Sequence, residues 1–175
     1  MTASEFLQET EHMAVTAADF RRTLGSFASG VTVITTVRPD GSPVGMTVSA
    51  FSSLSVDPPL VLVCVACSAY SHPVFESCRR FAVSVLNGNQ GKLARRYATA
   101  GGEKFRDGDT EFGPVSGLPL IRGALASMEC ESYQVLPGGD HSILVGLVSS
   151  VTHQPGTPLV NYRGTLGSFS DDSLD

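Results

Sequence analysis

Short runs of β-branched and apolar residues, separated by Gly, Pro and Asp, recur along most of this chain. Such runs predict β-strands joined by turns. Asp40-Gly41 predicts a turn that pairs the first two strands as a hairpin. Residues 121–131 and 132–136 predict either one long bent strand or two. The predicted strands are residues 31–37, 44–51, 60–66, 81–86, 121–136, 143–151, 159–162 and 165–169.

Helical spacing of apolar residues appears in only a few places. Thr16 has the sequence context of an N-cap, and the apolar residues that follow recur at helical spacing until Ser29-Gly30. Residues 71–79 predict a short helical piece with a proline in its first turn, and residues 90–98 a surface helix. Many strands with few helices predict a mainly β fold that forms a closed or half-closed barrel.

Composition and length narrow the class of protein. The chain has 175 residues and a net charge of -5, with 12 Lys and Arg residues that form no obvious cluster, which argues against a nucleic-acid partner. The longest apolar run, residues 60–67, is far shorter than the roughly 20 residues of a membrane span. The first residues lack the pattern of a secretory signal, so we expect a cytoplasmic protein. We expect one domain over residues 16–170, with a mobile lead-in at 1–15 and a tail at 171–175.

The four cysteines include a Cys64-x-x-Cys67 spacing. No second pair follows and no His is placed to complete a tetrahedral set, so we expect no metal site. Free cysteines are often simply core residues, and we expect buried thiols here.

A row of small hydroxyl side chains fills residues 45–60, between two predicted strands. Hydroxyls donate and accept hydrogen bonds at short reach, so this segment either holds a polar flat ligand or caps its own backbone. The chain contains no phosphate loop, no Gly-x-Gly-x-x-Gly after a strand and no Gly-x-Ser-x-Gly elbow. These absences argue against an ATPase, a Rossmann dinucleotide site and a common serine hydrolase.

Among the four histidines, His141 has the most suggestive setting. It follows the Gly138-Gly139-Asp140 turn and enters a predicted strand, which would hold it at a barrel rim with Asp140 near its ring. Functional and structural interpretations are both open for this residue. His12 and His153 have no such setting, and His72 at a helix start is either a surface residue or a neighbour of a ligand phosphate.

Taken together, these segments resemble the short-chain flavin reductases of two-component flavin-dependent monooxygenases. The resemblance covers about residues 19–169, and its most specific pieces are Gly139-Asp140-His141, Tyr162-Arg163-Gly164 and the hydroxyl-rich segment. It implies an FMN-binding split β-barrel of Greek-key type, usually a homodimer with flavin near the subunit interface. The remaining matching segments are residues 20–22, 27–36, 81–86, 104–105, 123–125 and 145–146.

The resemblance also implies an activity: reduction of FAD or FMN by NADH or NADPH, with release of the reduced flavin to a separate oxygenase. No clear Arg pair is present for a 2′-phosphate, which favours NADH. His141 would be the catalytic residue, bordering the nicotinamide side of the flavin together with Tyr162. The residues expected to bind cofactor are Met46, Thr47, Val48, Ser49, Ser52, Ser53, Cys67, Ser68, Ser71, His72, Lys104, Phe105, Tyr162 and Arg163.

Ser84 stands where relatives commonly have Asn in a Phe-Ala-Val-Asn-Val-Leu pattern, and its shorter side chain cannot make the same two-ended amide contact. Two other functions fit the same barrel. One is a flavin or haem carrier without turnover. The other is a flavin oxidase like pyridoxamine phosphate oxidase, which would need a basic phosphate clamp. Lys92, Arg95 and Arg96 are the only candidates for such a clamp, and they fit a solvated helix face.

Overall fold

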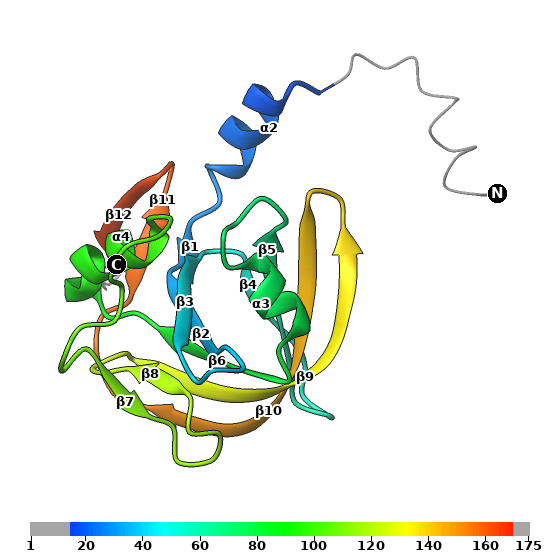
Figure 1. Ribbon diagram of the computed structural model, residues 1–175. Coiled ribbons are helices and arrows are strands. Elements are labelled where there is room, and N and C mark those ends of the chain that lie inside the picture. Colours follow the sequence, from blue (N-terminus) through cyan, green and yellow to red (C-terminus); the bar gives the residue numbers. More distant parts are fainter. Residues whose placement is uncertain (1–14, 170–175) are drawn as a thin grey trace.

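The computed structural model describes residues 15–169, and its largest sheet is one curved antiparallel sheet of seven strands (Figure 1). The predicted hairpin is confirmed, with Thr32 opposite Val48 and Val37 opposite Pro43. The mainly β class is therefore confirmed. In order across the sheet, the strands are β3 (Pro43–Val48), β2 (Thr32–Val37), β6 (Arg80–Val85), β9 (Ala126–Gly138), β10 (His141–His153), β5 (Leu60–Ala66) and β4 (Phe51–Ser55).

β9 and β10 form the long, bent spine of this sheet. Residues 126–138 make one continuous strand, which resolves the choice between one strand and two, although residues 121–125 lie outside it. The pairing with β10 slips at Val145/Gly146 and again between Val148 and Ser150. Bulges of this kind bend a strand and increase its twist. At Gly146 an added Cβ would lie 2.5 Å from the Phe81 ring, so the bend brings β6 too close for a side chain there.

The sheet curls until its two edge strands, β3 and β4, are near neighbours. Only Ser49 and Ala50 separate them in sequence, yet they stand at opposite ends of the strand order. Ile34 of β2 and Val63 of β5 belong to one buried cluster, so both halves of the sheet face the same core. The result is a barrel that stays open between β3 and β4, the split arrangement that the sequence predicts. We call this opening the seam.

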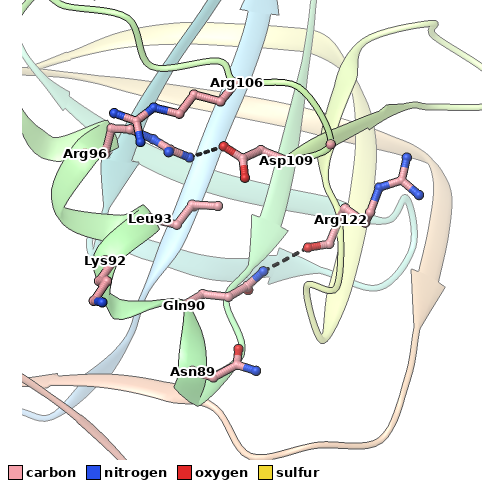
Figure 2. Close-up of a pocket in the computed structure, with 9 residues that line it drawn as sticks. Asn89, Gln90, Lys92, Leu93, Arg96, Arg106, Asp109 and Arg122 are labelled. Carbon is pink, nitrogen blue, oxygen red and sulfur yellow. Dashed lines mark hydrogen bonds and ion pairs between the residues drawn. The ribbon is translucent and has the colours of Figure 1, made fainter.

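Two small sheets complete the fold. One joins β1 (Ser29–Gly30), β11 (Leu159–Tyr162) and β12 (Thr165–Ser168), and the other pairs β7 (Thr110–Phe112) with β8 (Pro119–Ile121). The segment 99–117, which has no hydrophobic periodicity in the sequence, contains the short strand β7. It is tied to helix α4 (Gly91–Ala98), which follows the 3-10 turn η1 (Gly88–Gln90), by an ion pair between Arg96 and Asp109 (Figure 2).

Helix α2 (Ala17–Leu24) projects away from the barrel in Figure 1. Its predicted N-cap is confirmed, because the Thr16 hydroxyl accepts a hydrogen bond from the Asp19 amide at 3.1 Å. None of its side chains is buried. Helix α3 (His72–Ser77) packs against β10, β5 and β2, with Phe75 in the core. The predicted lead-in 1–15, except its last residue, and the tail 171–175 lie outside the described residues.

Among the residues that the structure describes, no helix is long and apolar enough to cross a lipid bilayer.

Candidate functional site

A cavity of about 400 Å³ opens at the seam, beside the link between β3 and β4. We call it the seam cavity. Its walls are mostly apolar, with a few polar groups at the edge, which is typical of sites for flat ring systems. The lining residues are Leu24, Gly25, Phe27, Ser29, Ser49, Ala50, Phe51, Ser52, Leu62, Cys64, Asn161 and Arg163.

His141 lies on the same face of the sheet as this cavity. It pairs with Ala66 in β5, two residues beyond Cys64, which lines the cavity. Side chains alternate between faces along a strand, so His141, Ala66 and Cys64 point to one side while Ser142 points into the core. The predicted catalytic residue and three of the predicted cofactor residues, Ser49, Ser52 and Arg163, are thus brought to one face.

The hydroxyl side chains of segment 45–60, which we call the cradle segment, differ in their hydrogen bonds. Thr47 donates to the carbonyl of Ala94 at 2.7 Å, and Ser52 donates to the carbonyl of Ser53 at 3.0 Å. Only the Ser52 bond fits the self-capping alternative, because the Thr47 hydroxyl bonds helix α4, 47 positions away. Ser49 forms no hydrogen bond with its hydroxyl within residues 15–169 and is exposed at the cavity wall. Ser49 is therefore the hydroxyl best placed to bind a ligand.

A second cavity, of about 130 Å³, lies at the other end of β3. We call it the rim cavity. Ser71, Lys104 and Phe105, three of the residues expected to bind cofactor, all line it. The Ser71 hydroxyl also contacts the Met46 sulfur at 3.3 Å, which links this cavity to the middle of β3. The full lining is Arg38, Pro43, Val44, Gly45, Tyr70, Ser71, Gly101, Gly102, Lys104 and Phe105.

The Lys104 ammonium is held firmly in the rim cavity. It donates to the carbonyl of Gly45 at 3.1 Å and to that of Tyr97 at 3.0 Å. Burial lowers the pKa of Lys104, because the cation loses hydration that two carbonyls only partly replace. An ammonium group has three donors, so one hydrogen is left for an anionic ligand.

His141 and Asp140 are hydrogen-bonded at the turn between β9 and β10, with Nδ1 2.7 Å from Oδ1. The hydrogen bond from His141, together with its charge, lowers the pKa of Asp140. An ionised Asp140 accepts a hydrogen from Nδ1, which directs Nε2 away from the turn. The pair therefore fixes the ring orientation while leaving one ring nitrogen for a ligand.

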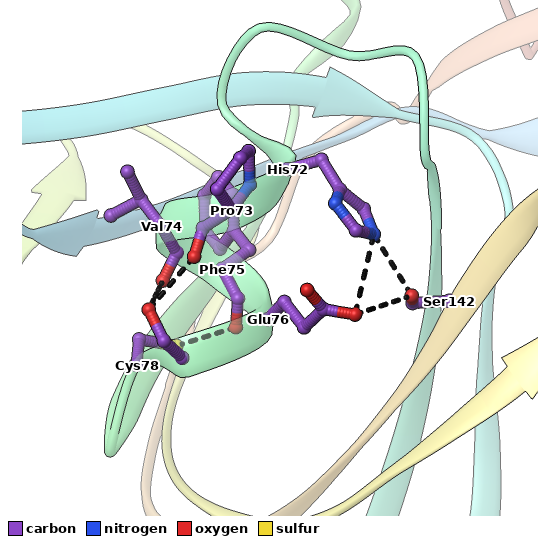
Figure 3. Close-up of polar contacts among 8 residues, drawn as sticks. His72, Pro73, Val74, Phe75, Glu76, Cys78 and Ser142 are labelled. Carbon is purple, nitrogen blue, oxygen red and sulfur yellow. Dashed lines mark hydrogen bonds and ion pairs between the residues drawn. The ribbon is translucent and has the colours of Figure 1, made fainter.

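His72 has a different setting from the one expected. Its ring is buried, and Nε2 lies 2.8 Å from the hydroxyl of Ser142, which is itself 3.4 Å from Glu76 (Figure 3). Nε2 is thus engaged by the protein instead of facing a ligand phosphate. The network ties α3 to the start of β10, next to His141, so the geometry gives His72 a structural role.

The other predicted cofactor residues lie at the edges of the two cavities. Cys67 and Ser68 follow β5 and are exposed, and the Cys67 amide donates to the carbonyl of Asp140 at 2.9 Å. The expectation of a buried thiol is therefore wrong for Cys67, because β5 ends one residue earlier. Tyr162 is exposed beneath the Arg163 guanidinium, 5.3 Å from its ring centroid. Met46 and Val48 lie on β3, and Ser53 is exposed on β4.

Several cavity residues were missed in the sequence. Leu24 and Phe27 were assigned only to a helix pattern, and Asn161 only to a strand. The exposure of Phe27, 78%, is the structural sign that this segment faces something other than its own core. Ser84 is fully buried and accepts a hydrogen bond from the Ile121 amide at 3.0 Å, so this residue packs inside the protein.

Comparison with known proteins places these features in a family. Residues 24–170 match the family model described as flavin reductase like domain. The chain is 42% identical over 175 residues to a protein named FMN reductase (NADH) SmoA from Agrobacterium fabrum, covering 97% of this chain and 99% of the relative. It is 39% identical over 152 residues to the reductase component of a 4-nitrophenol 4-monooxygenase/4-nitrocatechol 2-monooxygenase from Rhodococcus opacus, covering 87% of this chain and 80% of that one.

A solved structure gives the same result in three dimensions. It is the NADH:FAD oxidoreductase SgcE6 of Streptomyces globisporus C-1027 in complex with NAD and FAD fragments, with a TM-score of 0.83 and 39% identity. The alignment covers 89% of this chain and 94% of the solved chain.

Proposed function

The chain belongs to the flavin reductase-like family, and from this premise we infer that it is an NADH-dependent flavin reductase that reduces FMN or FAD and supplies the reduced flavin to a separate monooxygenase component. The observation that carries this conclusion is the match to a reductase over nearly the full length of both chains. NADPH is a possible second donor to test.

The cavities fit a flavin in shape and chemistry. The seam cavity offers an apolar wall with the free hydroxyl of Ser49 and the guanidinium of Arg163, and the rim cavity offers Lys104. We propose that the seam cavity holds the ring system and that Lys104 and Ser71 bind the phosphate end. Phe105, Met46 and Thr47 belong to the walls between them, and Cys67, Ser68 and Tyr162 to the edges.

Bound flavin supplies the hydride acceptor, so the protein needs no nucleophile of its own. Its residues act by positioning and by hydrogen bonding. We propose that His141, oriented by Asp140, binds the nicotinamide or donates a proton through Nε2. The free hydroxyl of Ser49 and the charge of Arg163 would stabilise negative charge on a ligand in the seam cavity.

We also propose a homodimer. Helix α2 buries none of its side chains, and Phe20, Leu24 and Phe27 expose more than half of their surface. A second copy of the chain that covers this helix would close the seam cavity, which Leu24 and Phe27 line. We assign the family domain to residues 16–170. The thiols at Cys64, Cys67, Cys78 and Cys130 are all free, which supports a reducing, cytoplasmic setting.

The decisive experiment is a steady-state assay of NADH oxidation with FMN, FAD and riboflavin in turn, followed by gel filtration. We expect NADH oxidation with at least one flavin, and loss of flavin from the protein on the column. Retained flavin without NADH oxidation would identify a carrier instead, and absence of activity with every flavin would refute the reductase.

A further inference from the structure

A third cavity, of about 520 Å³, lies on the far side of α4 and shares no lining residue with the seam or rim cavity. We call it the basic cavity. Figure 2 shows α4 on one side of it and the segments carrying Arg106 and Arg122 facing that helix. The lining residues are Asn89, Gln90, Lys92, Leu93, Arg96, Arg106, Gly108, Asp109 and Arg122.

The lining of the basic cavity is positively charged, whereas the whole chain is negatively charged. Four of its residues are Lys or Arg, out of only 12 in a protein of net charge -5. Asp109 is the only acidic residue in the lining, and its carboxylate is already paired with Arg96. A concentration of one third of all cationic side chains around one hollow creates a local positive potential that attracts anions.

Much of this positive charge is not neutralised by the protein. Within residues 15–169, Lys92 and Arg106 form no ion pair, and Arg122 has only a loose one, 3.9 Å from Glu111 with both side chains exposed. Arg96 also keeps a buried Nε without a hydrogen-bond partner among the described residues. Unmatched donors of this kind are the groups that bind phosphate and carboxylate.

The three basic residues of α4 do not all face the same way. Lys92 and Arg96 are four residues apart, so they lie on the same side of α4 and both line the cavity. Arg95 is exposed and does not line it. The interpretation as a solvated helix face describes Arg95 fully, whereas the exposed Lys92 and the half-buried Arg96 also line the cavity.

The cavity walls are built by the fold and do not depend on a ligand. Gln90 accepts from the Asn87 amide at 2.8 Å and donates to the carbonyl of Arg122 at 2.9 Å, which fixes the Arg122 backbone against η1. The Arg96–Asp109 ion pair fixes the opposite wall. The walls are thus fixed by protein contacts, and Lys92 and Arg106 are left without an ion-pair partner among the described residues.

We propose that the basic cavity is a second anion-binding site, separate from the flavin site, which takes the phosphoryl group of a small phosphorylated ligand. A phosphoryl group carries up to two charges and three acceptor oxygens, which match several cationic donors at once better than a single carboxylate does. The volume leaves room for an organic portion beside Leu93 and the Asn89 amide.

Calorimetric titration of inorganic pyrophosphate into the full chain, at fixed ionic strength, tests the proposal. We expect binding that weakens roughly tenfold or more in Lys92→Gln/Arg106→Gln, because two charge-assisted hydrogen bonds to the phosphoryl oxygens are lost. Arg95→Gln, on the same helix but outside the cavity, is the matched control and should bind like the parent. Lys104→Gln should keep this site and lose only binding in the rim cavity.

Three results would overturn the proposal: no binding by the parent chain, equal weakening in Arg95→Gln, or complete loss in Lys104→Gln. Both replaced residues of the double variant are exposed, so folding should survive. Amide chemical shifts of the parent provide a measurement without any variant, and pyrophosphate should move Leu93 and Gly108. A paired titration with AMP and adenosine shows whether an organic phosphate binds through its phosphate. NADH oxidation is measured separately, so failure here leaves the reductase assignment intact.

Discussion

Single hydroxyl groups in the cradle segment differ in whether their hydrogen is free. Ser49 and Ser52 both line the seam cavity, but only Ser52 donates to a neighbouring carbonyl. We expect Ser49→Ala to weaken flavin binding about two- to tenfold, the effect of one lost hydrogen bond, and Ser52→Ala to change it little. Fluorescence titration with FMN and FAD measures both. Equal effects would mean that the Ser52 bond rearranges when flavin binds.

The His141–Asp140 pair permits a second test at the level of single residues. We expect His141→Ala to lower kcat/KM for NADH roughly tenfold or more, because the group that positions or protonates the reactants is removed. Asp140→Asn should cause a smaller loss, since the ring remains but its orientation is no longer fixed by a carboxylate. Stopped-flow NADH oxidation at several pH values separates the two variants. An unchanged rate and unchanged apparent affinity in His141→Ala would remove this residue from the site.

Single-residue features could be predicted from the sequence when they depend on near neighbours in the chain, and could not when they depend on residues far apart in it. The Thr16 cap depends on residues three apart, so a pattern reveals it. The burial of His72 depends on α3 packing against β10, where Ser142 lies 70 positions away. No spacing rule connects such residues, so their contact cannot be read from the chain.

At the scale of elements, the contact between β3 and α4 tolerates no side chain at Gly45. An added Cβ would lie 2.8 Å from the Tyr97 ring and 3.1 Å from that of Phe105. We expect Gly45→Ala to destabilise the protein by about 1–3 kcal/mol through overpacking, and to weaken flavin binding by moving β3. Urea denaturation measures the first effect and flavin titration the second. Gly41→Ala has no neighbour within 4 Å but a positive φ, so any loss there reports backbone strain alone.

The loop between β7 and β8 is anchored by a buried carboxylate on β9. Glu129 accepts from the amide and the hydroxyl of Ser116, each at 2.5 Å. Burial raises the pKa of Glu129, but the hydrogen bonds from Ser116 and Val115 outweigh it, so the net pKa is lowered. A lowered folded-state pKa stabilises the fold above the unfolded value of 4.5, and this contribution is lost as the pH falls through the folded value.

We therefore expect Glu129→Gln to lower the free energy of unfolding by about 1–3 kcal/mol at pH 7, and by less at pH 3. Denaturant titrations of both proteins at the two pH values measure the difference. A gap that stays constant with pH would show that the charge of Glu129 is not what the loop requires.

The ends of helices and strands were likewise predictable only where neighbouring residues in the chain set them. The strand at residues 60–66 was predicted to the residue, since prolines and a turn bound it. The strand β7 was missed, because Thr110–Phe112 has no pattern of its own and becomes a strand only through pairing with Pro119–Ile121. The start of β9 at Ala126 was misplaced for a similar reason, since Ile121 belongs to β8 and residues 122–125 form a connection that depends on the pairing of β8 with β7.

For the whole molecule, the exposed apolar residues of α2 and of the turn that follows it, where Phe27 lies, allow a test of the dimer. We expect Phe27→Asp to shift the chain from dimer to monomer and to weaken flavin binding at least tenfold, because Phe27 lines the seam cavity and would lie at the interface. Analytical ultracentrifugation and flavin titration give the two values. Phe112→Asp is the control, since this ring is 81% exposed on β7, far from α2 in Figure 1. A parent chain that is monomeric at micromolar concentration would contradict the proposal.

The barrel as a whole was foreseeable, while its cavities were not. The resemblance predicts the split barrel, and strand patterns support it independently. The seam cavity, however, collects residues from α2, β4, β5 and β11, and its lining follows from the curl of the sheet. The basic cavity needs η1, α4 and Arg122 together, so the sequence presents its cations only as scattered charges.

The open seam also bears on how quickly a ligand can be exchanged. No ladder of backbone hydrogen bonds joins β3 to β4 in the described chain, so emptying the cavity does not require two strands to separate. Side-chain and loop movements suffice, and these occur within nanoseconds to microseconds, whereas local unfolding takes microseconds to seconds. Residence time is thereby uncoupled from the stability of the sheet. A rigid scaffold can then hand over its product at every turnover without loosening its core.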